Sequence, residues 1–275
     1  MTGNAAADVG EQVSADRMKS LVAELASSRY AGRRVGGEGC AKARALVAGH
    51  LVSSGFTVAE DRFPVGDGEG VNLYARIPGA DPAAVEVLLT AHLDGVGDLA
   101  DRRRPGASDN ASGVTVVVEA ARLLAAGPVE GVGVSLALLD AEEVGALGSA
   151  HHASALVAAG ARPLVMNVDG AGRIDEAVAV EADNAAHGLL SALDQAGRAA
   201  GVRLRAGQVA SDNRRYAAAG LAVVGLGAGM PGYHTEHDTA ERVEAETLVA
   251  IARLVVATVR ELGRAVHTAR EIEER

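Results

Sequence analysis

The sequence contains no tryptophan, one cysteine and few aromatic residues (2%), and this composition excludes several kinds of site and fold stabilisation. The lone Cys40 excludes an internal disulfide bond and a metal cluster held by several thiolates, and it favours a reducing compartment. No apolar stretch reaches about 18 residues, so no membrane-spanning helix is expected. Acidic residues outnumber basic ones, 36 to 26, which argues against nucleic acid or an anionic membrane as main partner.

Length and termini indicate how the chain is organised. With 275 residues the chain is normal for one layered α/β domain with a large core. We therefore predict one domain over residues 1–275, with a flexible segment at 1–12 and a frayed tail at 266–275. Met1 to Val13 is polar and acidic and lacks an apolar signal core, which favours a cytoplasmic location. Secretion is the alternative for a chain that has lost a leader. The sequence predicts no particular oligomeric state.

Hydrophobic periodicity predicts alternating helices and strands. The predicted helices run from Ala15 to Ser27, Cys40 to Ser54, Val114 to Ala126, Ala146 to Ala159, Ala186 to Ala200 and Ala245 to Leu262. The predicted strands run from Val71 to Ile77, Val85 to Ala91, Val132 to Leu139, Leu164 to Val168, Ala177 to Glu181 and Ala222 to Gly227. This alternation favours an α/β fold in three α/β/α layers, with helices on both faces of a mostly parallel mixed sheet.

Acidic or imidazole side chains follow three of the predicted strands, at the point where each strand ends. These residues are His92, Asp94, Glu142, Glu143 and Asp169. His92 and Asp94 point to the same face of their strand, so the carboxylate can orient the imidazole. In open α/β sheets ligands bind at the carboxyl edge, so the sequence predicts that these side chains share one site.

Two predicted loops add further candidates. Asp109 lies in a turn of small residues before a helix, where it can approach two metal ions closely. Tyr233 and His234 follow the glycine-rich stretch Gly225 to Gly232, which can bring a phenol and an imidazole to the site. Each signal alone has an ordinary structural explanation, such as a helix cap or a solvated loop. Their occurrence in one order predicts a two-metal hydrolase.

With these motifs the chain resembles the co-catalytic dizinc aminopeptidases, family twenty-eight of the metallopeptidases, and in particular its bacterial aminopeptidase S-like members. The matching phrases are Ala91-His92-Leu93-Asp94, Gly106 to Gly113, Glu142-Glu143 with Gly148-Ser149, Asn167-Val168-Asp169, and Tyr233-His234-Thr235 with Asp238-Thr239. The resembling part runs from about Leu21 to Leu254. The resemblance implies the phosphorylase/hydrolase-like fold of zinc exopeptidases.

The resemblance also implies a role for each matching residue. His92 and Asp169 would hold one metal ion, Glu143 and His234 the other, and Asp109 would bridge the two. The remaining implied roles belong to Glu142 as general base, Asp94 as the partner of His92, and Tyr233 as the group that polarises the scissile carbonyl. A cis peptide bond is implied between Asp109 and Asn110.

The chain departs from its relatives near the substrate pocket. Where relatives often have Ser-Asp-His, this sequence has Ser211-Asp212-Asn213, followed by Arg214. We assign Asp212, Asn213 and Arg214 to substrate binding on the strength of that position alone. The side-chain preference of the pocket is not predicted.

The expected function is hydrolysis of the N-terminal peptide or aminoacyl amide bond of small peptides, through a metal-bridging water with Glu142 as base. Two Zn²⁺ ions are expected, with Co²⁺ or Mn²⁺ as substitutes, because oxygen and imidazole ligands suit all three. The main alternative is a compact dizinc deacylase or amidohydrolase acting on a small metabolite. Glutaminyl cyclases are disfavoured because they have one zinc and tryptophan-rich pockets, and a non-catalytic binding module because no ligand is missing.

Overall fold

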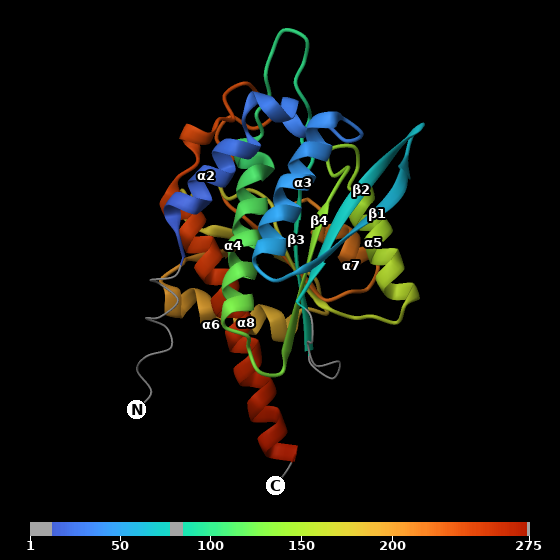
Figure 1. Cartoon of the computed structure of the whole chain (residues 1–275). Helices are drawn as coiled ribbons and strands as arrows, with labels where there is room; N and C mark the ends of the chain where they lie inside the picture. Colours follow the sequence, from blue (N-terminus) through green and yellow to red (C-terminus); the bar gives the residue numbers. More distant parts are fainter. Residues whose placement is uncertain (1–12, 78–84, 274–275) are drawn as a thin grey trace.

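The computed structural model describes residues 13–77 and 85–273, and its centre is one mixed sheet of eight strands (Figure 1). The predicted flexible segment 1–12 lies outside the described residues. The strands are β1 (Thr57–Val65), β2 (Gly68–Arg76), β3 (Val85–His92), β4 (Val132–Leu139), β5 (Leu164–Val168), β6 (Val178–Ala182), β7 (Leu204–Ala206) and β8 (Val223–Gly227). Their spatial order is β1-β2-β4-β3-β5-β8-β6-β7.

The middle of the sheet is parallel and its margins are mixed. β4, β3, β5 and β8 are neighbours and run parallel to one another. β1 and β2 form a long antiparallel hairpin, β2 joins β4 antiparallel, and β6 joins β8 antiparallel while pairing parallel with β7. The carboxyl ends of four adjacent strands therefore meet at one edge, which is where ligands bind in sheets of this type.

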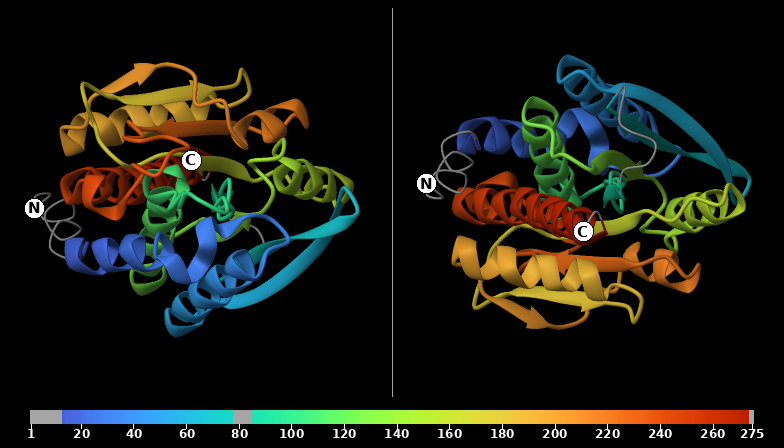
Figure 2. Two further views of the ribbon diagram at one scale, coloured as in Figure 1. Left: turned by 90° about the horizontal axis from the view of Figure 1, so that it is seen from above. Right: turned by 90° about the horizontal axis from the view of Figure 1, so that it is seen from below.

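Helices cover both faces of this sheet, as the end-on views of Figure 2 show. One face carries α2 (Ala15–Leu25), α3 (Glu38–Ser53), α4 (Ser112–Ala126), α6 (His187–Ala200) and α8 (Ala245–Glu273). The other face carries α5 (Leu147–Ala158) and α7 (Asn213–Ala218). Three short helical turns connect them: η1 (Ser28–Arg33), η2 (Ala107–Ala111) and η3 (Ala240–Arg242). None of the described helices is long and apolar enough to cross a membrane.

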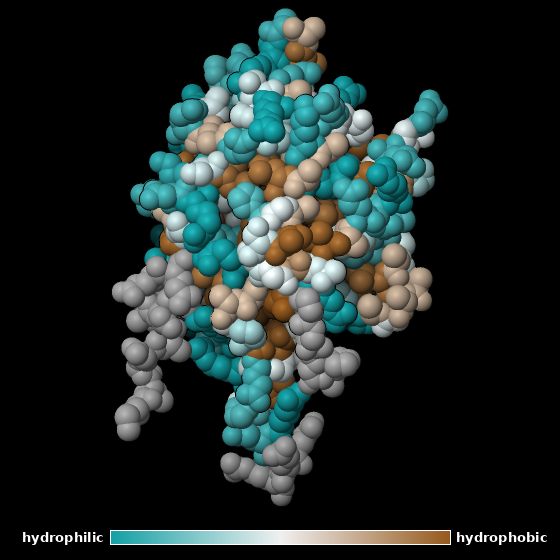
Figure 3. All heavy atoms as spheres, in the orientation of Figure 1, coloured by the Kyte–Doolittle hydropathy of each residue, from teal (hydrophilic) through white to brown (hydrophobic). Residues whose placement is uncertain are grey.

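Alternate side chains of the central strands pack into the hydrophobic clusters on the two faces of the sheet. In β3, Val87 and Leu89 belong to the large hydrophobic cluster on the α4 and α8 face, whereas Leu88 belongs to the smaller cluster under α5 and α7. A strand buried on both faces has no polar side, which explains why β3 reads as a continuous apolar run. On the outside, Figure 3 shows hydrophilic residues over most of one face, with hydrophobic residues gathered near its middle.

The predicted fold class is confirmed, and the differences lie at the margins of the sheet. β1, β7 and α7 were missed. β1 alternates poorly because it is a hairpin strand with many exposed residues, and β7 and α7 are too short to give a periodic signal. α8 runs to Glu273 and therefore includes most of the range for which we predicted a frayed tail. In Figure 1 the end of α8 projects below the rest of the structure.

We expect Leu89→Ala in β3 to lower the free energy of unfolding by about 2–5 kcal/mol, because Leu89 is fully buried between strands and helices. Leu190→Ala is the matched control, since Leu190 on α6 is 40% exposed, and a change within about 0.5 kcal/mol is expected there. Urea unfolding of both variants measures the difference. Equal losses would contradict the packing described for β3.

Candidate metal centre at the carboxyl edge of the sheet

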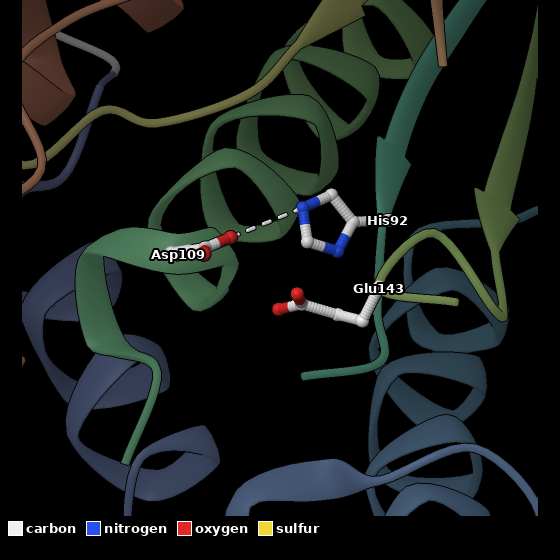
Figure 4. Close-up of side chains that lie close together, drawn as sticks. All are labelled: His92, Asp109 and Glu143. Carbon is white, nitrogen blue, oxygen red and sulfur yellow. Dashed lines mark ion pairs between the residues drawn. The ribbon is translucent and has the colours of Figure 1, made fainter. Parts of the chain in front are cut away.

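Five side chains from separate elements meet at the carboxyl edge of the parallel strands. His92 is the last residue of β3, Glu143 lies in the loop after β4, Asp169 directly follows β5, and His234 lies in the loop after β8. Asp109 comes from η2, just before α4. Figure 4 shows His92, Asp109 and Glu143 pointing toward one another from these three segments.

Asp109 lies between the two histidines, and each of its carboxylate oxygens faces one of them. Oδ1 is 3.2 Å from His92 Nε2, and Oδ2 is 3.0 Å from His234 Nε2. A second carboxylate accompanies each histidine: Asp169 Oδ1 is 3.3 Å from His92 Nε2, and Glu143 Oε2 is 3.0 Å from His234 Nε2. The site therefore consists of two groups, each of one imidazole and one carboxylate, that share Asp109.

The turn that carries Asp109 is tied to the end of β5. The Asp109-Asn110 peptide bond is cis, as the resemblance implied. The Asn110 side chain donates from Nδ2 to the carbonyl oxygen of Val168 (3.0 Å), and its Oδ1 accepts the amide of Gly170 (3.1 Å). Asp169 lies between Val168 and Gly170. These bonds therefore fix the carboxylates of Asp109 and Asp169, which both face His92, relative to each other.

Asp94 connects the end of β3 to the glutamate pair. Its Oδ1 accepts the amide of Glu142 at 3.0 Å, and its Oδ2 accepts the amide of Glu143 at 3.2 Å. His92 Nδ1 lies 3.3 Å from the main-chain oxygen of Asp94 and 3.5 Å from its carboxylate Oδ1. The predicted contact with His92 is therefore accompanied by two amide hydrogen bonds that the sequence did not indicate, and these place Glu142 and Glu143.

Burial and mutual repulsion perturb the acids of this site. Burial raises the pKa of Glu143 to about 8, and the charge of Asp109 adds to the rise. Burial likewise raises the pKa of Glu142 to about 7, opposed by His92 and reinforced by Asp169. Burial also acts to raise the pKa of Asp109, but its contacts with His234 and His92 outweigh this effect and lower it.

The histidines respond in the opposite sense. Burial acts to lower the pKa of His92, yet the charge of Asp169 and the contact with Asp109 raise it well above its ordinary value. The contact with Asp109 raises the pKa of His234 as well. Both imidazoles therefore lie in strongly negative surroundings, which also favour a bound cation.

The unpartnered atoms of the site also suit a cation. His234 Nε2 and Glu143 Oε1 are buried without a hydrogen-bond partner in the described part of the chain, although Nε2 lies 3.0 Å from two carboxylate oxygens. Buried polar atoms usually have partners, and an atom aimed between two carboxylates is placed as a metal ligand would be. The donor set of carboxylate oxygens and imidazole nitrogens fits zinc, cobalt or manganese.

Comparison with known proteins agrees with this arrangement. The sequence model described as peptidase family M28 matches residues 72–259. The chain belongs to peptidase family M28. The predicted family and the prediction of a peptidase are therefore confirmed. No curated protein matches the chain.

Solved structures related to family M28 share its fold. The zinc aminopeptidase BSAP from Bacillus subtilis has 17% identity and a TM-score of 0.80, with 90% of this chain and 95% of that one covered. The LapA aminopeptidase of Legionella pneumophila has 20% identity and a TM-score of 0.77, covering 94% and 74%. A glutaminyl cyclase of Porphyromonas gingivalis has 24% identity and a TM-score of 0.77, covering 91% and 99%.

Tyr233 lies at the rim of the site in this M28 chain. The residue is 54% exposed, and its ring stacks on the ring of His234 with centroids 3.8 Å apart. Burial of part of the residue raises the pKa of its phenol to about 12, so the hydroxyl stays protonated at neutral pH. A phenol in this position can donate a hydrogen bond to a bound substrate.

The residues predicted to bind substrate lie at the start of α7, where the charges of His92 and Glu142 still affect Asp212. Asp212 and Asn213 are buried at the start of α7, and the Asn213 side chain lies directly against Gly225. Arg214 Nε pairs with Glu181 Oε1 at 2.8 Å. Burial raises the pKa of Asp212 to about 8. The assignment of these residues to substrate binding stays a prediction.

Two buried residues that support the site received no role from the sequence. Asp238, four residues after His234, accepts the amide of Ser108 at 2.6 Å and the amide of Asp109 at 3.1 Å. Arg33, from η1, donates to the main-chain oxygens of Leu93 and Gly106. Asp238 belongs to a family motif that implies no role for it, and Arg33 follows a helix in an otherwise ordinary polar stretch.

We expect the zinc affinity of the metal-free protein to rise by about tenfold or more from pH 6.5 to pH 7.5, because a cation must displace protons. The pKa of Glu143 is raised to about 8, and the pKa values of His92 and His234 are raised as well, so these groups hold protons to a higher pH than usual, and the protons compete less with a cation as the pH rises. Competition with a chromophoric chelator at each pH gives the affinity. A pH-independent affinity would show that the groups are already deprotonated.

Proposed function

We propose that this M28 chain is a dizinc aminopeptidase that hydrolyses the N-terminal peptide or aminoacyl amide bond of small peptides. The observation that carries the proposal is the pair of imidazole and carboxylate groups that share Asp109. His92 and Asp169 would hold one ion, Glu143 and His234 the other. Bound at this place, two divalent ions would make a water molecule acidic and polarise the scissile carbonyl.

Glu142 is the proposed general base. Its carboxyl group is near enough to His92, Asp169 and Asp109 for their charges to affect its pKa, which is about 7. A group with a pKa near the working pH can take a proton and return it. Glu142 would therefore accept the proton of the attacking water and pass it to the leaving amine.

Asp94 and Tyr233 have supporting roles in this proposal. Asp94 holds the main chain of Glu142 and Glu143 through two amide hydrogen bonds, so base and ligand move together. Tyr233 lies on His234 and keeps its phenolic proton, so it would donate a hydrogen bond to the substrate carbonyl oxygen as negative charge develops there.

Action at the amino terminus is supported by two further points. The aminopeptidases from Bacillus subtilis and Legionella pneumophila share this fold. A free α-amine also has a nitrogen lone pair that could bind a metal ion held at this site, whereas an acetylated α-amine does not. Zinc is proposed because the BSAP structure is described as a zinc aminopeptidase and because the donor atoms here suit zinc.

Aminoacyl anilides tested with a free and an acetylated α-amine measure the proposed specificity. We expect zinc-loaded protein to cleave the free forms at least tenfold faster, because only they carry a free α-amine that can bind at the metal site. Preferential cleavage of the acetylated forms would favour the alternative of a compact deacylase. Loss of activity after dialysis against a chelator, with recovery on adding zinc, should accompany the result.

A glutaminyl cyclase is the second candidate, because two such structures from Porphyromonas gingivalis share the fold. The sequence argues against this candidate, because a tryptophan-rich pocket is expected of such cyclases and this chain has no tryptophan. The two imidazole and carboxylate groups that share Asp109 also support a site for two ions rather than one. A glutaminyl peptide in the same panel separates the two. Release of ammonia with the peptide bond intact would indicate the cyclase.

We expect Glu142→Gln to lower kcat by at least about 10³-fold while the stoichiometry of bound zinc stays unchanged. The amide keeps the shape of the side chain but cannot accept the proton. Glu246→Gln is the matched control, because Glu246 is exposed in the first turn of α8. Activity of Glu142→Gln close to that of the control would refute the assignment of the base.

A further inference from the structure

Arg33 lies fully buried behind the metal centre and donates to main-chain oxygens from three segments. Nε donates to Leu93 at 2.9 Å, and Nη1 donates to Leu25 and Pro105, both at 2.9 Å. Nη2 donates to Gly106 at 2.7 Å. One guanidinium therefore joins the end of α2, the residue between His92 and Asp94, and the turn that leads to Asp109.

The main chain around Arg33 makes a second set of contacts with the same region. The amides of Gly95, Gly97 and Asp98 donate to the oxygens of Arg33 (3.2 Å), Gly32 (3.2 Å) and Ala31 (3.0 Å), respectively. Gly32 has a φ of +66°, and a Cβ there would lie 2.7 Å from two main-chain atoms of neighbouring loops. The segment carrying Arg33 therefore pairs with the chain immediately after Asp94.

Asp238 completes the arrangement from the opposite side of the Asp109 turn. Its carboxylate accepts the amides of Ser108 and Asp109, and its main-chain oxygen accepts the amide of Ala107 at 3.2 Å. Arg33 binds carbonyl oxygens of this turn, whereas Asp238 binds its amides. The main chain of the proposed bridging residue is thus held between a buried cation and a buried anion.

The charge of Arg33 acts on the acids without neutralising one of them in an ion pair. Burial lowers the pKa of the guanidinium, and the charges of Asp109, Asp238 and Asp94 oppose this effect. An arginine stays protonated at any ordinary pH. Because the five hydrogen bonds found for its side chain go to main-chain oxygens, the carboxylates keep their lone pairs for other partners.

We propose that Arg33 is a positioning residue that holds the ligand-bearing ends of β3 and η2 in their metal-binding arrangement before any ion binds. The inference rests on the proposed metal site. It assigns to Arg33 a role that neither the family motifs nor the ligand geometry supplies. It also predicts whether replacing Arg33 strengthens or weakens zinc binding.

The direction of the change in zinc affinity distinguishes a positioning role from a purely electrostatic one. A buried positive charge repels a metal cation, so electrostatics alone predicts that removing Arg33 strengthens zinc binding. If Arg33 instead preorganises the loops, its removal weakens zinc binding, because the ion must then order them itself. The direction of the change in affinity therefore decides between the two.

The test measures the zinc affinity of wild-type protein, Arg33→Lys, Arg33→Met and a control by competition with a chromophoric chelator. Lysine keeps the charge but has fewer donors and no planar fork. Arg17→Met is the control, because Arg17 pairs with the buried Glu119 (3.0 Å) between α2 and α4, away from the site. It therefore reports the effect of lost stability alone.

We expect Arg33→Met to bind zinc about 10- to 100-fold more weakly than wild type, the range typical of residues that orient metal ligands. Arg33→Lys should fall between the two, and Arg17→Met should stay within about twofold of wild type. Unchanged or stronger zinc binding by Arg33→Met would overturn the inference. So would an equal loss in Arg17→Met.

Hydrogen exchange of wild-type protein provides a measurement that does not depend on folding of the variants. We expect the amides of Gly95, Gly97 and Asp98 to be protected in metal-free protein and to slow by less than about tenfold when zinc is added. Rapid exchange in metal-free protein, with strong protection only after zinc binding, would overturn the inference.

The outcomes also separate this inference from the proposed function. Wild-type protein that binds zinc and cleaves peptides while the Arg33 variants keep wild-type affinity would refute only the role of Arg33. Wild-type protein that binds zinc and cleaves no substrate would refute the aminopeptidase, and the affinities would still decide the role of Arg33. Absence of zinc binding in wild type would refute both.

Discussion

The burial of several acidic side chains at one edge of the sheet is the constraint on which the rest of this structure depends. Four adjacent parallel strands end at the same edge, so the acids that follow them are forced together. Main-chain amides of the loops donate hydrogen bonds to carboxylates of this region, as at Asp94 and Asp238. Each amide lowers the free energy of a nearby negative charge without occupying the lone pairs that face the centre.

This solution explains why the supporting groups come from so many elements. A single loop cannot bind its own carbonyls and amides and also present ligands in a fixed direction. Asn110 ties the Asp109 turn to β5, Asp238 ties it to the His234 loop, and Arg33 ties it to β3 and α2. The backbone of the site is therefore hydrogen-bonded across elements, and the sheet supplies the common frame.

The residues at the strand ends could be predicted from the sequence, whereas the residues that hold the loops could not. His92 and Asp169 follow apolar runs whose length and pattern identify buried strands, and parallel strands bring such ends together. Arg33 contacts main-chain oxygens of residues up to 76 positions away, and main-chain partners leave no trace in side-chain patterning. The burial of Asp212 could not be predicted from the sequence either, because the helix that follows it has only six residues and shows no hydrophobic periodicity.

The number of acids in this site overstates its negative charge. Burial raises the pKa of Glu142 to about 7, that of Glu143 to about 8 and that of Asp212 to about 8, so in metal-free protein these groups hold protons near neutral pH. Neutral carboxyl groups let the loops close with little repulsion, and Arg33 offsets part of the charge that remains. Because protonation reduces the repulsion between these carboxyl groups, the site can form without a bound cation. A cation could then enter by exchange for protons, and Glu142, the proposed general base, has a pKa of about 7, the protonation range that this role requires.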